Sequence, residues 1–217
     1  TTTINQATLQ VGANNNLGTG AILVDGGTLR TTNTFAITAT RTVTMGTSGG
    51  TLETAPSTTL TYAGAIAGSG TLTKEGTGTF VTGGTGFNTW TGPLVVNAGE
   101  FQVAKQVFVG AIDNAAPVTV ATGATLRLNG SAAFTQETIG TLSGGGLVVN
   151  SGAAAVNFVL SGASNTTFSG TISNTANALN LIKTGAGTQI LSGNLAYTGT
   201  TVLSNGLLQI GDGSTYN

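Results

Sequence analysis

The chain of 217 residues contains no cysteine and no histidine, and only 6% of its residues are charged. Without cysteine, disulfide bonds contribute nothing to its stability. Without histidine, it lacks the side chain that most often acts as an acid–base catalyst or metal ligand. Soluble domains average about 25% charged residues, so Thr, Ser, Asn and Gly must form most of this surface.

Two further absences concern partners and helices. The net charge is −1, which gives no electrostatic basis for binding nucleic acid or an anionic membrane. No run of about 18 apolar residues is present, so we expect no helix inserted in a membrane. No stretch sustains a 3.6-residue apolar period, and 35 residues are glycine. We therefore expect an all-β chain.

What the sequence has instead is short alternation of apolar and polar residues, as in Val156–Leu160. A small residue followed by Thr, Leu and a polar residue recurs around Leu9, Leu29, Leu52 and Leu72. Their spacing of roughly 20–23 residues fits one coil of a solenoid, with each leucine above the last. An antiparallel sandwich or barrel is the alternative, with Asn-Gly and Asp-Gly hairpins. The recurrence favours a parallel β-helix of roughly ten coils.

A longer self-match organises the chain. Residues 68–103 resemble residues 177–210, with lysine, glycine and aromatic residues at corresponding positions. The matched pairs include Lys74 and Lys183, Gly76 and Gly185, Gly78 and Gly187, and Trp90 and Tyr197. Repetition on this scale is typical of repeat architectures. We expect residues 1–217 to form a single β-solenoid domain.

Both stretches resemble the autotransporter-associated β-strand repeat, which occurs in passenger regions of bacterial autotransporters and in giant surface proteins. The motifs that carry the resemblance are Leu72–Thr79, Trp90–Gly92, Asn97–Val103, Leu181–Thr188 and Tyr197–Gly199. The resemblance implies a right-handed parallel β-helix exported to the bacterial cell surface. It implies no catalytic activity.

The two ends of the chain together almost rebuild half of this motif, as a third copy split across 215–217 and 1–11. Neither end carries an amphipathic helix or charged strand that would cap a solenoid. Open strand edges pair with other strands, and repeat proteins usually need polar caps. We therefore expect copies of the chain to continue one another, covalently in tandem or head to tail. The residues expected at this contact are Thr3, Ile4, Leu9, Val11, Leu208, Ile210 and Tyr216.

The charged residues offer little chemistry. The 7 acidic residues are scattered singly, whereas a glycosidase needs two carboxyl groups ~5–10 Å apart. Arg30 and Glu53 follow successive Thr-Leu units, so we expect them to form an exposed ion pair between adjacent coils. Lys74 and Lys183 are expected to cover coil corners with their aliphatic stems. We predict no catalytic residues, no cofactor and no metal site.

Aromatic residues gather in one region of the sequence, at Phe80, Phe87, Trp90, Phe101 and Phe108. We expect most of them to stack in the core. Phe87 and Trp90 are flanked by Gly, Asn and Thr, which makes them the candidates for an exposed platform that binds glycans or surfaces.

Two functions follow from these observations. The first is a non-enzymatic extracellular rod that forms or belongs to a surface fibre, with further copies of itself as partners. The alternative is an adhesin or passenger segment that binds glycans or cell-surface or matrix components. Self-association without a ligand would distinguish the two. An enzyme ranks third, because it would need an acid cluster that the sequence does not bring together.

Overall fold

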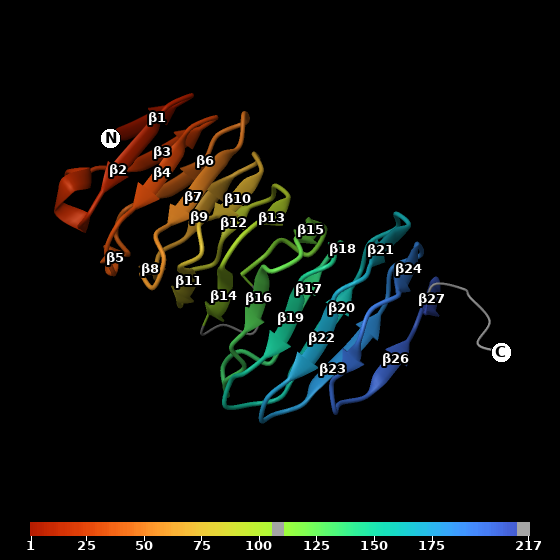
Figure 1. The fold of residues 1–217 in the computed structure, drawn as a ribbon. Coiled ribbons are helices and arrows are strands. Elements are labelled where there is room, and N and C mark those ends of the chain that lie inside the picture. Colours follow the sequence, from red (N-terminus) through yellow and green to blue (C-terminus); the bar gives the residue numbers. More distant parts are fainter. Residues whose placement is uncertain (106–110, 212–217) are drawn as a thin grey trace.

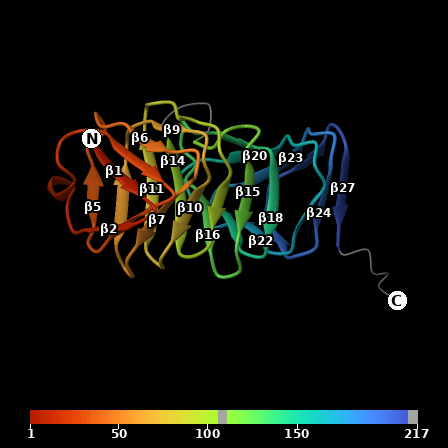
Figure 2. The same cartoon turned by 90° about the horizontal axis from the view of Figure 1, so that it is seen from above.

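The computed structural model describes residues 1–105 and 111–211, which form a rod of stacked coils (Figure 1). Neighbouring strands in each sheet are parallel and lie on successive coils. Seen from above, β1 and β27 lie at opposite ends of the rod (Figure 2). The predicted parallel β-helix is confirmed.

Three faces surround the core. The longest sheet has ten strands and therefore spans nine turns, close to the roughly ten coils expected. Its strands, in spatial order, are β2 (Thr8–Val11), β4 (Thr28–Thr31), β7 (Gly50–Thr54), β10 (Leu72–Glu75), β13 (Leu94–Val96), β15 (Pro117–Val120), β18 (Thr141–Gly144), β21 (Thr166–Phe168), β24 (Thr188–Leu191) and β27 (Leu207–Ile210). We call it the long sheet.

The second face is an eight-stranded sheet. Its strands are β5 (Phe35–Ile37), β8 (Thr59–Tyr62), β11 (Thr79–Gly84), β14 (Glu100–Lys105), β16 (Thr125–Leu128), β19 (Leu147–Asn150), β22 (Thr171–Asn174) and β25 (Leu195–Ala196). In the first coil a short 3-10 helix, η1 (Asn14–Leu17), takes the place of a strand on this face.

The third face is divided between two sheets. A five-stranded sheet covers the first coils, and a four-stranded sheet covers the last ones. The first contains β1 (Thr2–Asn5), β3 (Ile22–Asp25), β6 (Val43–Met45), β9 (Ile66–Gly68) and β12 (Thr89–Trp90). The second contains β17 (Gln136–Ile139), β20 (Val156–Leu160), β23 (Leu179–Lys183) and β26 (Thr201–Leu203).

Inward-facing side chains form ladders along the rod, as period-2 strands require. Leu29 pairs with Leu9 below it and with Leu52 above it, as the Thr-Leu units predict. The next step differs, because Lys74 lies above Leu52 while Leu72 pairs with Gly50. The prediction for Leu72 is therefore wrong: the lengths of the corners, and not the spacing of the leucines, set the register.

Glycines occupy corners where successive coils meet closely. Gly99 has φ 64°, and a Cβ on it would lie 2.4 Å from the carbonyl oxygen of Gly78 in the coil below. The equivalent Gly206 has φ 74°, and its Cβ would lie 2.5 Å from the carbonyl oxygen of Gly187. Only glycine tolerates both the left-handed backbone and this contact. The spacing of glycines in the repeat motif thus follows from coil stacking.

Candidate functional site

The candidate site is the pair of ends of the solenoid. At the C-terminal end, β26 pairs with β23 and β27 pairs with β24, so Leu203 lies over Lys183 and Ile210 over Leu191. These positions face the core in the coils below, yet Leu203 is 53% exposed and Ile210 is 58% exposed. Leu207 is exposed as well, but it pairs with Thr188 on the outward side of the sheet. The described residues therefore leave inward-facing apolar side chains uncovered at this end.

The N-terminal end differs from this. Ile4 and Val11 belong to the first coil, yet they are only 3% and 4% exposed. Leu17 of η1 joins them in the hydrophobic core, and η1 lies at the outermost end of the rod in both views (Figures 1 and 2). The apolar side chains of the first coil are therefore buried, while β1 and β2 remain the edge strands of their sheets. We call residues 12–20 the lid.

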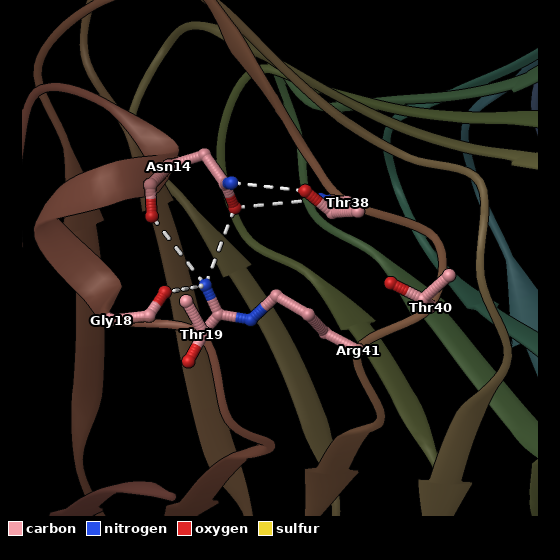
Figure 3. Close-up of a pocket in the computed structure, with 6 residues that line it drawn as sticks. All are labelled: Asn14, Gly18, Thr19, Thr38, Thr40 and Arg41. Atoms are coloured by element: carbon pink, nitrogen blue, oxygen red, sulfur yellow. Dashed lines mark hydrogen bonds between the residues drawn. The ribbon is translucent and has the colours of Figure 1, made fainter.

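Arg41 holds the lid in place (Figure 3). Its side chain is buried, and its Nε, Nη1 and Nη2 donate to the carbonyl oxygens of Gly20, Gly18 and Leu17, each at 2.9 Å. The carbonyl oxygen of Arg41 in turn accepts a hydrogen bond from the buried Tyr62 hydroxyl. Arg41 thus connects the lid to the second and third coils. Sequence reasoning missed it, because an arginine between two threonines looks like any exposed residue of a strand.

The other residues predicted at the contact between copies of the chain lie on the strands at the two ends of the rod. Thr3 is exposed on β1, and Leu9 is half-buried on β2. Leu208 is half-buried on β27 and packs against the core. Tyr216 lies outside the described residues. Whether these residues mediate assembly stays a prediction.

The two aromatic residues predicted to form an exposed platform, Phe87 and Trp90, differ in their exposure. Phe87 is 59% exposed in the loop before β12. Trp90 is only 1% exposed, and its Nε1 donates to the carbonyl oxygen of Gly70 at 2.7 Å. The predicted exposure of Trp90 is wrong, because β12 turns the indole into the core and Gly70 satisfies its polar atom. Phe80 and Phe101 stack there as expected, with ring centroids 5.4 Å apart.

The motif lysines point inward instead of covering corners. Lys74 is buried, and its Nζ donates to the carbonyl oxygens of Glu75, Gly76 and Ala98. Lys183 is also buried and donates to the carbonyl oxygen of Gly185. Burial lowers the pKa of Lys74 to about 8 and also lowers the pKa of Lys183. Both lysines satisfy corner carbonyl groups, so their role is structural.

Two further buried ionisable groups lie where the third face changes sheets. Glu137 on β17 accepts backbone N–H bonds from Ala111 and Ile112, each at 3.0 Å, and burial raises its pKa to about 8. Lys105 at the end of β14 donates to the carbonyl oxygen of Gly64 at 2.7 Å, and burial lowers its pKa to about 8. Each group anchors backbone at the junction between the two sheets.

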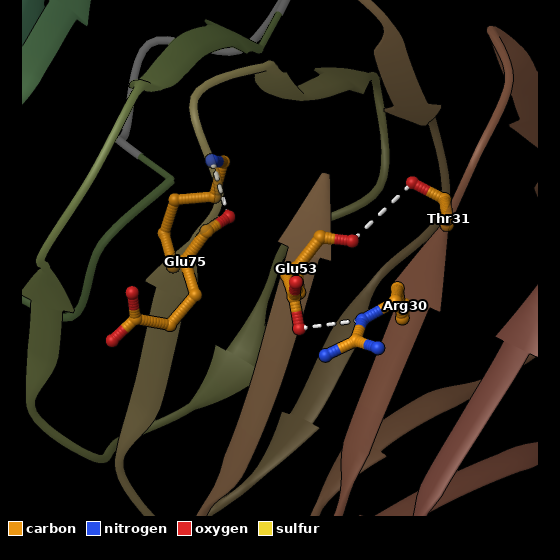
Figure 4. A network of polar contacts seen from close by, with 5 residues as sticks. Arg30, Thr31, Glu53 and Glu75 are labelled. Carbon is orange, nitrogen blue, oxygen red and sulfur yellow. Dashed lines mark hydrogen bonds and ion pairs between the residues drawn. The ribbon is translucent and has the colours of Figure 1, made fainter. Parts of the chain in front are cut away.

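Three of the remaining charged residues, Arg30, Glu53 and Glu75, form a row on the surface of the long sheet. Arg30 pairs in register with Glu53, and Arg30 Nε lies 2.9 Å from Glu53 Oε2 at the distance of an ion pair but without hydrogen-bond geometry (Figure 4). The predicted pair is confirmed. Glu75 follows in the same row, and its Oε1 accepts from Asn97 Nδ2 at 2.7 Å.

Within residues 1–105 and 111–211, no three His, Cys, Asp or Glu side chains gather as metal ligands would. None of the helices in this part of the chain has the length or apolarity to cross a membrane.

Comparisons with known proteins agree with the motifs. Residues 72–103 and 181–210 match the family model described as passenger-associated-transport-repeat. The adhesin BmaC autotransporter of Brucella suis biovar 1 (strain 1330) is 33% identical over 202 residues, which are 92% of this chain and 6% of that protein. The chain thus spans a small fraction of this relative's length. No solved structure matches the chain. The chain therefore carries two stretches that are similar to the passenger-associated-transport repeat.

Proposed function

We propose that the chain is a rod segment of a bacterial surface protein of the autotransporter passenger type, and that its role is mechanical and not enzymatic. The observation that carries this proposal is the uninterrupted long sheet, which pairs one strand from each of ten successive coils. Its backbone hydrogen bonds run along the rod, so a pulling force is shared by strands on every coil. The repeat family and the adhesin relative support a location at the cell surface.

The finer part of the proposal is that the rod continues into a fibre. The last described strands, β26 and β27, offer paired-strand edges together with the inward-facing apolar side chains of Leu203 and Ile210. A further coil stacked there would bury these side chains, which is favourable by roughly 25 cal/mol per Å² of apolar area. That coil would come from a tandem copy in the same protein or from a separate subunit. The near-absence of charge on the rod also suits lateral bundling, as in a biofilm matrix.

Electron microscopy of the native material with helical averaging tests this. For a fibre we expect an axial repeat that corresponds to the coils of one copy, with β27 of one copy beside β2 of the next. Isolated rods would contradict the fibre but would still be consistent with a rod segment. Compact particles without a long axis would contradict both.

An adhesive role is the second candidate, favoured by the exposed Phe87 and by the adhesin relative. Binding of the chain to a glycan array, lost in Phe87→Ala and retained in Phe35→Ala, would support it. Equal binding by both variants and the parent chain would contradict a role for Phe87.

A further inference from the structure

We propose that Asn205 is a site of spontaneous covalent modification, at which the backbone nitrogen of Gly206 displaces the side-chain amide group as ammonia. The first product is a cyclic imide (succinimide), which water opens to an aspartate or to an isoaspartate. The site lies on the exposed corner between β26 and β27. The reaction needs only water, so it does not depend on whether the rod continues beyond its last described coil.

The sequence offers two candidates for this reaction, because Asn-Gly occurs at Asn129–Gly130 and at Asn205–Gly206. Asparagine before glycine is especially open to it, since glycine has no Cβ to keep its backbone nitrogen away from the preceding side chain. The dipeptide alone does not distinguish the two sites. Their surroundings in the fold do.

At the second site the reacting groups already lie together. Gly206 N donates to Asn205 Oδ1 at 2.8 Å, so the side-chain carbonyl group lies against the nitrogen that attacks it. Reacting groups held this close have already met much of the entropic cost of reaction. Both residues are exposed, so water or hydroxide reaches them. The corner is also loosely held, since the bond from Asn205 N to the carbonyl oxygen of Lys183 is long, at 3.3 Å.

At the first site the attacking nitrogen is engaged elsewhere. Gly130 N donates to Asn150 Oδ1 at 3.3 Å and not to the side chain before it. Gly130 is buried, and a Cβ on Gly152 in the next coil would lie 2.0 Å from its nitrogen. Attack on Asn129 requires this nitrogen to give its proton to solvent and to turn toward Asn129, which both neighbours oppose. Of the two asparagines, Asn205 is therefore the one poised to react.

The first repeat copy, residues 68–103, has the same corner without the reactive residue. Ala98 takes the place of Asn205 there, in front of the left-handed Gly99 with φ 64°. Although β15 and β16 continue the rod above that corner, Ala98 is only half-buried and Asn97 is exposed. A further coil above β26 and β27 would therefore leave Asn205 accessible.

The reaction balances in two steps. A base takes the proton from Gly206 N, the nitrogen bonds to Cγ of Asn205, and the Cγ–Nδ2 bond breaks as ammonia leaves with a proton from water. Water then adds to one of the two ring carbonyl carbons. Opening at Cγ gives aspartate, and opening at the main-chain carbonyl gives isoaspartate, in which the backbone runs through the former side chain. Either product adds a negative charge to a chain of net charge −1, and isoaspartate also lengthens the corner.

The first test incubates the folded chain in water labelled with heavy oxygen and compares the peptides that contain Asn129 and Asn205 by mass spectrometry. We expect the Asn205 peptide to take up the label and to separate into aspartate and isoaspartate forms, at least about tenfold faster than the Asn129 peptide reacts. In the chain unfolded in guanidinium chloride the two rates should become similar. Equal rates in the folded chain, or an Asn205 peptide that stays unmodified, would overturn the proposal. A difference of the same size in the unfolded chain would overturn it too, because the fold would not select the site.

The second test moves the reactive residue to the first copy. Asn205→Ala introduces the residue found at position 98 and should abolish the acidic form that isoelectric focusing detects in the aged parent chain. Adding Ala98→Asn to this variant should restore an acidic form whose modification maps to position 98, because Gly99 and Gly206 share their backbone conformation. Circular dichroism checks that both variants fold. If the folded double variant stays unmodified while the parent chain reacts at Asn205, the geometry of the corner does not select the site and the proposal fails.

Discussion

The two repeat copies have matching motifs but different surroundings. The second coil of the first copy, β13 and β14, lies under β15 and β16, and its Val96, Phe101 and Val103 are buried. The second coil of the second copy, β26 and β27, is the last described one, and its Leu203 and Ile210 are exposed. The motif therefore specifies the contact with the coil below, while burial depends on the coil above. The exposed apolar residues are thus those of an ordinary coil above which no further coil is described.

The copies also differ in the faces they use. Lys74 lies on β10 in the long sheet, and Phe101 lies on β14 in the eight-stranded sheet. Their counterparts lie one face earlier in the winding, with Lys183 on β23 in the four-stranded sheet and Leu208 on β27 in the long sheet. The repeat is therefore compatible with any of the three faces. Its unit is a strand with its corner, and not a whole turn.

The largest effect in this comparison should come from truncating matched core residues. Phe101→Ala should reduce the free energy of unfolding by about 3–5 kcal/mol, because it leaves a cavity among fully buried side chains. Leu208→Ala, at the matching position, should cost roughly 1–2 kcal/mol, because Leu208 is half-buried. Urea unfolding followed by circular dichroism measures both. Equal losses would show that the last coil is as firmly packed as an internal one.

A smaller difference should separate the matched corner glycines. Gly99→Ala should cost about 2–4 kcal/mol, since it combines a left-handed residue with a backbone clash. Gly206→Ala meets a similar clash, but the last coil can open locally without unfolding the rod. Hydrogen exchange should therefore report faster exchange confined to β26 and β27 in Gly206→Ala, and a global change in Gly99→Ala. Exchange that rises throughout the rod in Gly206→Ala would contradict local opening.

The pH dependence of stability should show a minimum near pH 8. Between pH 4.5 and about 8 the folded chain binds more protons than the unfolded chain at Glu137, so stability falls as pH rises. Between about 8 and 10.5 the unfolded chain binds more protons at Lys74 and Lys105, so stability rises with pH. Thermal melts across this range measure the curve.

Matched variants assign the two limbs of this curve. Glu137→Gln should flatten the fall toward pH 8, and Lys74→Met should reduce the rise above it. Lys183→Met tests the second copy and should leave the contribution of Lys74 intact. A curve that Glu137→Gln and Lys74→Met leave unchanged would rule out these groups as its source.

The smallest effect should come from making the first copy more like the second at an exposed corner. Asn97→Ser introduces the residue found at the matching position 204 and removes the bond from Asn97 Nδ2 to Glu75 Oε1. An exposed hydrogen bond contributes little, so we expect a loss below about 1 kcal/mol. Asn97→Ala is the matched control, with a similar loss. A loss comparable to that of Gly99→Ala would show that this corner depends on the bond.

Local patterns predicted the stacking well and side-chain burial less well. The Thr-Leu units gave the pairing of Arg30 with Glu53, because residues on one strand alternate strictly between faces. They failed at Leu72, since register also depends on how many residues each corner uses. They failed at Lys74 and Trp90 for a second reason: a buried amine or indole is stable only where corner carbonyl groups of its own or a neighbouring coil accept its hydrogen bonds. Those acceptors come from residues distant in sequence or from backbone groups, which no side-chain pattern reveals.

The change of sheets on the third face has a consequence for the rod as a material. Among the described residues, the five-stranded sheet ends at β12 and the four-stranded sheet begins at β17, while the long sheet and the eight-stranded sheet continue past this level. Glu137 and Lys105 fasten loop backbone there. An axial load therefore passes from one half of the rod to the other through the backbone hydrogen bonds of these two continuous sheets.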